Sequence, residues 1–202
     1  MTIVLWKGDL KEALELSKFD QTNIEFGRIN YFFYLRQYEK LITNTDLYED
    51  QFIYSPKSLN LAFSYFLNAN NSMSVKYADS AIAELSQKIK QFPEDDRYYA
   101  ALGYAFAYKG EKNKAIECVQ KAVNLKPIRL DAWQGYHKEL DLMKIYIITG
   151  DYDLAMDKIE YLLKIPGDLS VPFLKVDPVF DKLRNLTRFQ RILTTEYKTN
   201  YE

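Results

Sequence analysis

The chain is poor in the residues from which catalytic and metal sites are usually built. Its 202 residues include one cysteine, Cys118, and one histidine, His137. A single cysteine excludes an internal disulfide, and a single imidazole leaves a multi-histidine metal site without a second ligand. A Cys118–His137 pair is one alternative, but a packed or surface thiol is the simpler interpretation of a cysteine in a helical stretch. We therefore expect no catalysis by this chain, no metal and no cofactor.

Glycine, proline and long apolar runs are scarce as well. The seven glycines are scattered singly, so the sequence has no glycine-rich phosphate loop. No apolar run approaches the ~20 residues that a membrane helix needs, and the apolar stretch 3–6 is too short for a signal peptide. The net charge of -1 provides no basic field for nucleic acid or an anionic membrane. We expect a cytoplasmic protein that contacts neither nucleic acid nor a membrane.

A short phrase occurs three times, beginning at Gly8, Gly110 and Gly150. Each copy has an acidic residue after the glycine and an alanine five positions beyond it. Glycine supplies the left-handed residue that ends one helix, and the acidic side chain favours the amino end of the next. The alanine lets two helices approach closely. The phrase predicts repeated helix–turn–helix units, so the chain is expected to be nearly all helix.

The clearest unit spans residues 96–129. Its small and large residues follow a fixed order: Tyr99, Leu102, Gly103, Phe106, Gly110, Ala115, Val119, Ala122 and Pro127. This order resembles the tetratricopeptide repeat (TPR), a helical hairpin of about 34 residues. Gly103 and Ala115 are the expected point of contact between the two helices, and Pro127 ends the second helix.

The other repeats depart from this order. Residues 130–166 keep the turn glycine, with a first helix that we expect to be lengthened and to begin near Asp131. Residues 56–92 have lost that glycine; we expect helices from about 56 to 68 and from about 74 to 91. Residues 22–48 form a degenerate copy with Arg36 at the glycine position, and residues 1–19 form a partial one. Because the copy at residues 1–19 starts in the middle of a repeat, we expect the chain to be a piece of a longer protein; a frayed first repeat is the alternative.

Residues 167–202 form the expected C-terminal capping tail. Asp177 and Pro178 have the pattern of a helix N-cap followed by proline at the first helical position. The apolar residues expected to pack as the cap are Phe180, Leu183, Phe189, Ile192 and Leu193. The segment resembles the closing part of bacterial TPR arrays that follow nucleotide-cyclase, Ser/Thr-kinase or winged-helix DNA-binding domains. The resemblance implies a signalling or regulatory context.

The fold expected from these patterns is all-α: a right-handed TPR superhelix (α-solenoid) of antiparallel hairpins over residues 1–166, closed by the tail. In that fold the first helices of successive hairpins line a concave groove. The residues expected to form a peptide-binding groove are Phe26, Asn30, Phe33, Phe63, Phe66, Arg97, Tyr104, Tyr108, His137 and Lys144. An equally weighted alternative places many of these rings in the core.

The function expected from this surface is non-catalytic binding of a protein or peptide partner through aromatic contact. Some members of the family grip a C-terminal carboxylate with paired lysines and asparagines. Only Asn30 and Lys144 are of that kind here, so we do not expect such a clamp. Two alternatives remain: a ligand-sensing regulatory domain of an attached enzyme such as a cyclase or kinase, and a scaffold that self-associates into a homo-oligomer through its N-terminal edge.

Overall fold

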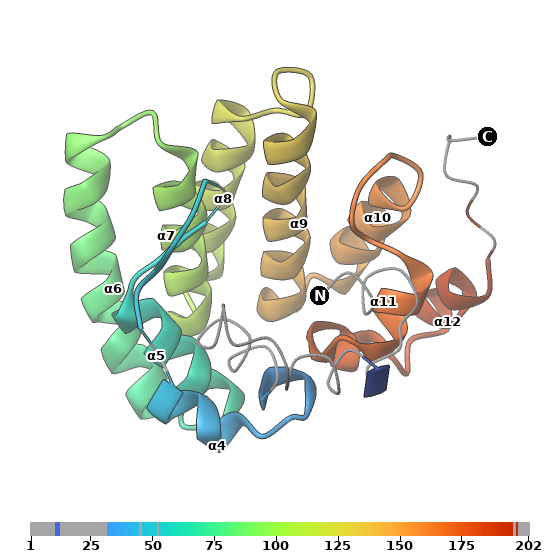
Figure 1. Cartoon of the computed structure of the whole chain (residues 1–202), viewed down its shortest axis with the longest axis horizontal. Helices are drawn as coiled ribbons and strands as arrows, with labels where there is room; N and C mark the ends of the chain where they lie inside the picture. Colours follow the sequence, from blue (N-terminus) through green and yellow to red (C-terminus); the bar gives the residue numbers. More distant parts are fainter. Residues whose placement is uncertain (1–10, 13–31, 45, 52, 196, 198–202) are drawn as a thin grey trace. The chain divides into compact units, whose positions relative to one another are not determined.

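The computed structural model describes residues 11–12, 32–44, 46–51, 53–195 and 197. These residues fall into two compact units. One, the central unit, spans Thr45–Asp151; the other, the terminal unit, combines Met1–Asn44 with Tyr152–Glu202. The boundary after Asp151 falls inside the expected repeat 130–166, and the described residues of both units are mostly helical (Figure 1).

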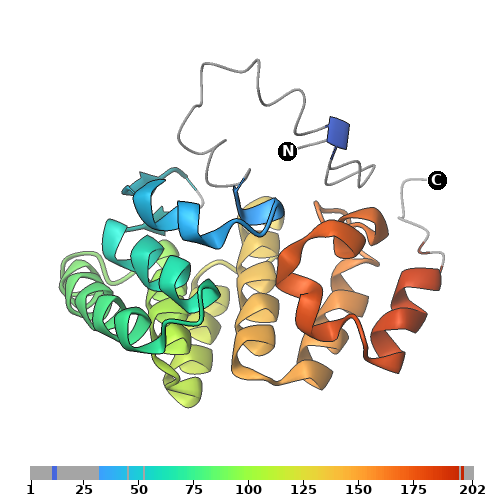
Figure 2. The same ribbon diagram turned by 90° about the horizontal axis from the view of Figure 1, so that it is seen from below.

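The central unit consists mainly of helices that pack against their neighbours in sequence. They are α5 (Lys57–Leu67), α6 (Asn71–Gln91), α7 (Asp96–Lys109), α8 (Lys112–Leu125) and α9 (Ala132–Thr149). Each packs on the next, and α7 also contacts both α5 and α9. The first helices of successive hairpins therefore lie side by side, as the two views in Figures 1 and 2 show.

Four helices end in the same kind of turn. After α7, the Gly110 N–H donates to the Ala107 carbonyl and the Glu111 N–H to the Phe106 carbonyl. The same two bonds recur around Gly150, Ala69 and Arg36. All four residues have a left-handed backbone, with φ between 54° and 86°. This is the conformation expected for the two glycines; alanine and arginine adopt it at a steric cost.

The contact expected between Gly103 and Ala115 is present in the α7–α8 hairpin. A β-carbon added to Gly103 would lie 3.0 Å from the Ala115 carbonyl oxygen and 3.3 Å from the Val119 β-carbon. Ala115 and Val119 are fully buried. Glycine at 103 is therefore what allows the two helix backbones to approach so closely.

The expected lengthened helix is also confirmed. Asp131 caps α9 by accepting hydrogen bonds from the amides of Trp133 and Gln134. In the α5–α6 hairpin, the second helix begins at Asn71 rather than about Ser74, because the Asn70 side chain caps it through the Met73 amide.

The described part of the chain is mostly helical, as expected, and the exception is a short two-stranded hairpin that precedes α5. Strands β1 (Tyr48–Glu49) and β2 (Tyr54–Ser55) pair antiparallel, with Tyr48 opposite Ser55. The Asp50 side chain closes the connection by accepting a hydrogen bond from the Ile53 amide, at 2.8 Å. We call residues 46–51 and 53–55 the strap; β2 contacts α7, which the strap crosses in Figure 1. The sequence pattern did not predict it because strands of two residues show no periodicity.

The terminal unit contains short elements from both ends of the chain. They are α4 (Tyr38–Leu41), the 3₁₀-helix η1 (Ile42–Asn44), α10 (Tyr152–Leu162), α11 (Val171–Val176), the 3₁₀-helix η2 (Pro178–Leu183) and α12 (Thr187–Thr194). The cap expected at Asp177 is confirmed, since its carboxylate accepts from the Val179 amide at 2.7 Å. Phe180, Leu183, Phe189 and Ile192 are buried as expected, and the Phe180 and Phe189 rings stack 6.0 Å apart.

Contacts over long distances in sequence join the two segments of the terminal unit. The Arg36 guanidinium donates to both oxygens of Asp181, at 2.8 and 2.9 Å. The Tyr34 hydroxyl donates to Asp177 at 3.4 Å, and burial raises the pKa of this phenol. The C-terminal segment thus binds the segment that contains Arg36. It also covers α10, because α12 packs against that helix.

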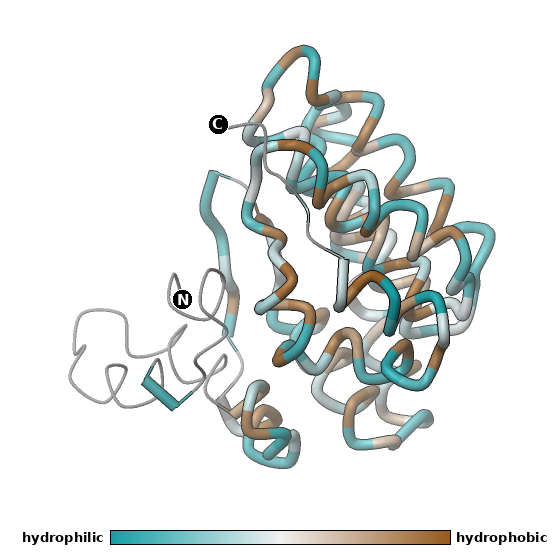
Figure 3. Tube along the Cα trace, turned by 90° about the vertical axis from the view of Figure 1, so that its right-hand side faces the viewer, coloured by the Kyte–Doolittle hydropathy of each residue, from teal (hydrophilic) through white to brown (hydrophobic). Residues whose placement is uncertain are grey.

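Hydrophobic and hydrophilic residues alternate at short intervals along the helices (Figure 3). Among the described residues, no helix has both the length and the apolar character needed to cross a membrane.

Candidate functional site

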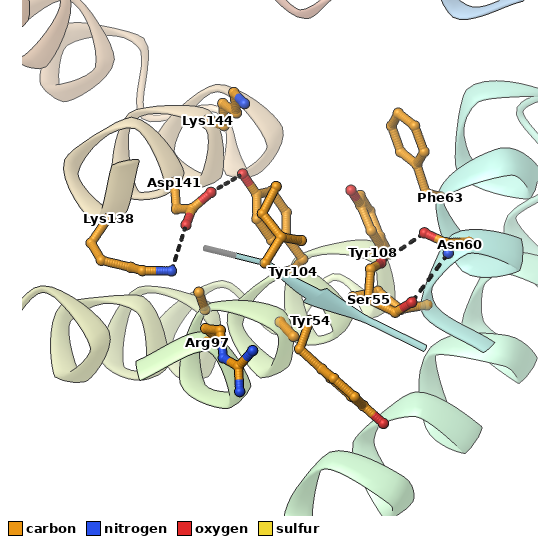
Figure 4. Close-up of a pocket in the computed structure, with 14 residues that line it drawn as sticks. Tyr54, Ser55, Asn60, Phe63, Arg97, Tyr104, Tyr108, Lys138, Asp141 and Lys144 are labelled. Atoms are coloured by element: carbon orange, nitrogen blue, oxygen red, sulfur yellow. Dashed lines mark hydrogen bonds and ion pairs between the residues drawn. The ribbon is translucent and has the colours of Figure 1, made fainter. Parts of the chain in front are cut away.

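The central unit contains a cavity of about 180 Å³. It lies where α5, α7 and α9 face the strap, and we call it the groove cavity. Its lining includes Tyr54 from the strap, Phe63 from α5, Tyr104 and Tyr108 from α7, and Lys138, Asp141 and Lys144 from α9 (Figure 4).

Aromatic rings form the walls. The Tyr104 and Tyr108 rings, one turn apart on α7, stack with their centroids 6.1 Å apart. Phe63 and Phe66 of α5 pack on Tyr108 at 5.7 and 5.2 Å. Tyr104 is half-buried, whereas Tyr108 is only 9% exposed. Tyr108 therefore belongs to the core and still borders the cavity, and Tyr104 forms more of its open wall.

A buried chain of charges fixes the position of Tyr104. The Lys138 side chain is 1% exposed, and its amine lies 3.2 Å from an Asp96 oxygen and 3.8 Å from Asp141. The other Asp141 oxygen accepts a hydrogen bond from the Tyr104 hydroxyl at 3.0 Å. Burial, followed by the Asp141 charge, raises the pKa of Tyr104 well above its usual value. Tyr104 is therefore held as a neutral hydrogen-bond donor.

Arg97 joins the start of α7 to the strap. Its guanidinium donates two hydrogen bonds to Asp95, at 2.7 and 3.0 Å, and a third to the Asp50 main-chain carbonyl at 2.6 Å. The Glu49 carboxylate lies 3.3 Å away. Hydrogen bonding to Asp95 raises the pKa of Arg97. Burial alone would raise the pKa of Asp95, but the bonds from Arg97 outweigh it and lower that pKa.

The lining charges are therefore largely compensated within the unit. Arg97 is neutralised by Asp95 and Glu49, and Lys138 by the carboxylates beside it. Lys144 is half-buried, and its amine forms no ion pair within the described part of the chain. What the cavity presents is thus a set of aromatic faces with one ammonium group at its edge (Figure 4).

The structure brings together five of the ten groove residues expected from the sequence. Phe63, Arg97, Tyr104, Tyr108 and Lys144 line the cavity. Phe66 packs behind Tyr108, and His137 lies outside the lining, where its ring meets Trp133 edge-on at 5.4 Å. Phe33 belongs to the terminal unit, and Phe26 and Asn30 lie outside the described residues.

Sequence reasoning missed the charges behind the aromatic wall. Lys138 and Asp141 are three residues apart on α9, the spacing at which helical side chains share a face. That spacing was a usable signal for the pair. The buried contact of Asp96 with Lys138, in contrast, depends on how α7 and α9 pack, and no local spacing indicates it.

Metal binding and the thiol of Cys118 are the other candidate chemistries. The described residues contain no cluster of three or more histidine, cysteine, aspartate or glutamate side chains placed to hold a metal ion. Cys118 is half-buried in α8, and burial raises the pKa of its thiol to about 11. The thiol is therefore protonated at neutral pH and a poor nucleophile.

Comparison with known proteins adds no relative. No protein-family model matches the chain, and neither a curated protein nor a solved structure matches it.

Proposed function

We propose that this chain is a non-catalytic interaction module that binds a peptide segment of another protein in the groove of the central unit. The observation that carries the proposal is the aromatic-walled cavity between α5, α7 and α9. Its volume of about 180 Å³ is below the ~300 Å³ at which pockets for drug-sized ligands begin. The size favours one anchoring side chain of a peptide over an entire small-molecule ligand.

The proposed architecture is a TPR-like array. It is supported by the four equivalent turns, by the close contact at Gly103, and by first helices that lie side by side. We extend this proposal to a right-handed superhelical path of the hairpins. On the resemblance of the tail from Asp177 to Phe189, we also propose that the module belongs to a bacterial signalling or regulatory protein and acts in the cytoplasm.

A selection from a random peptide library on the immobilised full chain tests the binding function. We expect enrichment of peptides with an aromatic or large aliphatic anchor. For a selected peptide, Tyr104→Ala is expected to weaken binding by about 2 kcal/mol, as for a buried anchor contact. The affinity should change little between low and moderate salt, because the contact is mainly apolar.

Tyr161→Ala is the matched control, since Tyr161 is an exposed tyrosine on α10, outside the cavity lining. It should leave the affinity unchanged. Library selection without any enrichment, or equal losses for Tyr104→Ala and Tyr161→Ala, would argue against peptide binding in this groove. Thermal melts of both variants separate lost binding from lost folding.

A further inference from the structure

The strap is held by groove side chains through its main chain. Arg97 donates to the Asp50 carbonyl at 2.6 Å, and the Asn60 side chain donates to the Asp46 carbonyl at 2.5 Å. Asn60 also donates to the Ser55 carbonyl, at 3.3 Å. Side chains that bind main-chain carbonyls recognise an extended segment with little regard to its sequence, the mode by which grooves commonly hold peptides.

Two side-chain contacts add selectivity. Tyr54 is buried, packs edge-on against Tyr98 at 4.9 Å and donates its hydroxyl to Glu84 at 3.0 Å. Glu49, which is paired with Tyr54 across the two strands, lies beside Arg97. Tyr54 points away from the cavity (Figure 4), so the strap occupies a slot next to it and leaves the cavity itself open.

We infer that the strap is an internal occupant of a peptide-binding slot that adjoins the groove cavity, and that the external partner is a β-hairpin segment bound there in the same way. Such a segment offers main-chain carbonyls to Arg97 and Asn60, a tyrosine to the slot formed by Tyr98 and Glu84, and a carboxylate to Arg97. The inference rests on the proposed peptide-binding function and adds the partner's chemistry. It also makes the strap a competitor that must open before the partner occupies the slot.

The features of the strap fit a replaceable occupant. Its strands are two residues long, and such a hairpin is at best marginally stable without support from other elements. The Glu49 side chain is 45% exposed, and residue Ile53 is 44% exposed. The helices beneath it also pack directly on one another, and opening the strap leaves these helix–helix contacts in place. Opening does expose Tyr54, which is 5% exposed and belongs to the core of the central unit, so the partner must bury an equivalent tyrosine.

The test uses the strap itself as the probe. In one variant of the full chain, residues 46–54 are replaced by a glycine–serine linker of equal length. A fluorescent peptide with the sequence of residues 46–55 and blocked ends is then titrated into this variant and into the unaltered chain. We expect the variant to bind the peptide at least tenfold more tightly, since its slot is empty.

Matched controls identify the contacts. A peptide with Tyr54→Ala should bind the variant at least tenfold more weakly, and Arg97→Ala in the variant should also reduce affinity at least tenfold. Equal binding of the peptide to the variant and to the unaltered chain, or no binding to a variant whose circular dichroism shows intact helices, would overturn the inference. Peptides selected from a random library would still support the proposed function in that case, so the two failures are distinguishable.

If the variant with the linker does not fold, hydrogen exchange of the unaltered chain tests whether the strap opens. The Asp50 amide, bonded to the Ile53 carbonyl at 2.9 Å, reports opening of the strap. Exchange at this amide that is at least tenfold faster than in the middle of α7 supports a strap that opens by itself. Exchange as slow as in α7 shows that the strap opens only on global unfolding, and overturns the inference.

Discussion

Helix α7 packs against α6 and α8, its direct neighbours in the chain, whereas the C-terminal segment is bound by residues from the opposite end of the sequence. Arg36 and Asp181 are 145 positions apart, yet they form a two-pronged ion pair. The central unit is therefore built from local hairpins, and the terminal unit depends on an encounter between distant segments. Local hairpins have a periodic pattern that a sequence reveals; the long-range contacts have none.

The turns extend the same comparison. Gly110 and Gly150 adopt the left-handed conformation readily, while Arg36 and Ala69 adopt it in turns with the same hydrogen bonds. Tertiary packing thus imposes the turn where the sequence no longer favours it. In consequence, replacing a turn glycine by alanine should lower the free energy of unfolding, and the reverse substitution at Ala69 should raise it.

The largest effect is expected from enlarging the closest contact in the central unit. Gly103→Leu would force side-chain atoms into the Ala115 carbonyl and Val119, and should lower the free energy of unfolding by about 3 kcal/mol. Gly103→Ala should cost clearly less, since only the β-carbon must fit. Chemical denaturation of both variants measures this, and equal stabilities of Gly103→Leu and the unaltered chain would contradict the α7–α8 packing.

A smaller pair of effects should distinguish the two kinds of turn. Gly110→Ala is expected to lower the free energy of unfolding by ~1 kcal/mol, because the added β-carbon meets nothing within 4 Å and only the backbone conformation is penalised. Ala69→Gly should raise it by roughly 0.5 kcal/mol, since glycine removes the strain but gains entropy in the unfolded chain. Changes of the same sign in thermal melts would show that the two turns are not equivalent.

The ion pair of the terminal unit should contribute less. Arg36 and Asp181 side chains are 43% and 37% exposed, so solvent screens their attraction. A double-mutant cycle with Arg36→Ala and Asp181→Ala should give a coupling of roughly 0.5–1 kcal/mol, the upper part of the range for exposed pairs because the contact is two-pronged. The more exposed Lys57–Asp46 pair is the control and should show a smaller coupling. A larger coupling for the control would contradict this ranking.

The last prediction concerns the chemical reactivity of the Cys118 thiol in the unaltered protein. Because burial raises the pKa of Cys118 from 9.0 to about 11, the folded protein keeps the thiol protonated to higher pH than the unfolded chain does. Alkylation proceeds through the thiolate, so at pH 8 iodoacetamide should react about 100-fold more slowly with the folded than with the unfolded protein. Mass spectrometry over time measures both rates. Equal rates would place Cys118 at an open surface.

The sequence predicted much of the central unit. Gly103, Gly110 and Pro127 are short-range signals, and each acts within its own hairpin, so the helices and turns around them could be located from the order of residues. Five residues that line the cavity were among those expected from the sequence. For two of them, Tyr104 and Tyr108, the reason is helical spacing, which places both on one face of α7. The buried Lys138 cluster was not anticipated, since it depends on the packing of α9 against α7.

By itself, the sequence determined the helical class, the hairpin turns with glycine, the helix caps at Asp131 and Asp177, and the aromatic character of the α7 face. All of these follow from interactions within a few residues. Only the tertiary structure decided that Arg36 meets Asp181, that Lys138 is buried against Asp96, and that the strap lies against α7. These contacts join residues far apart in the chain, and their geometry is fixed by how whole elements pack rather than by any local preference.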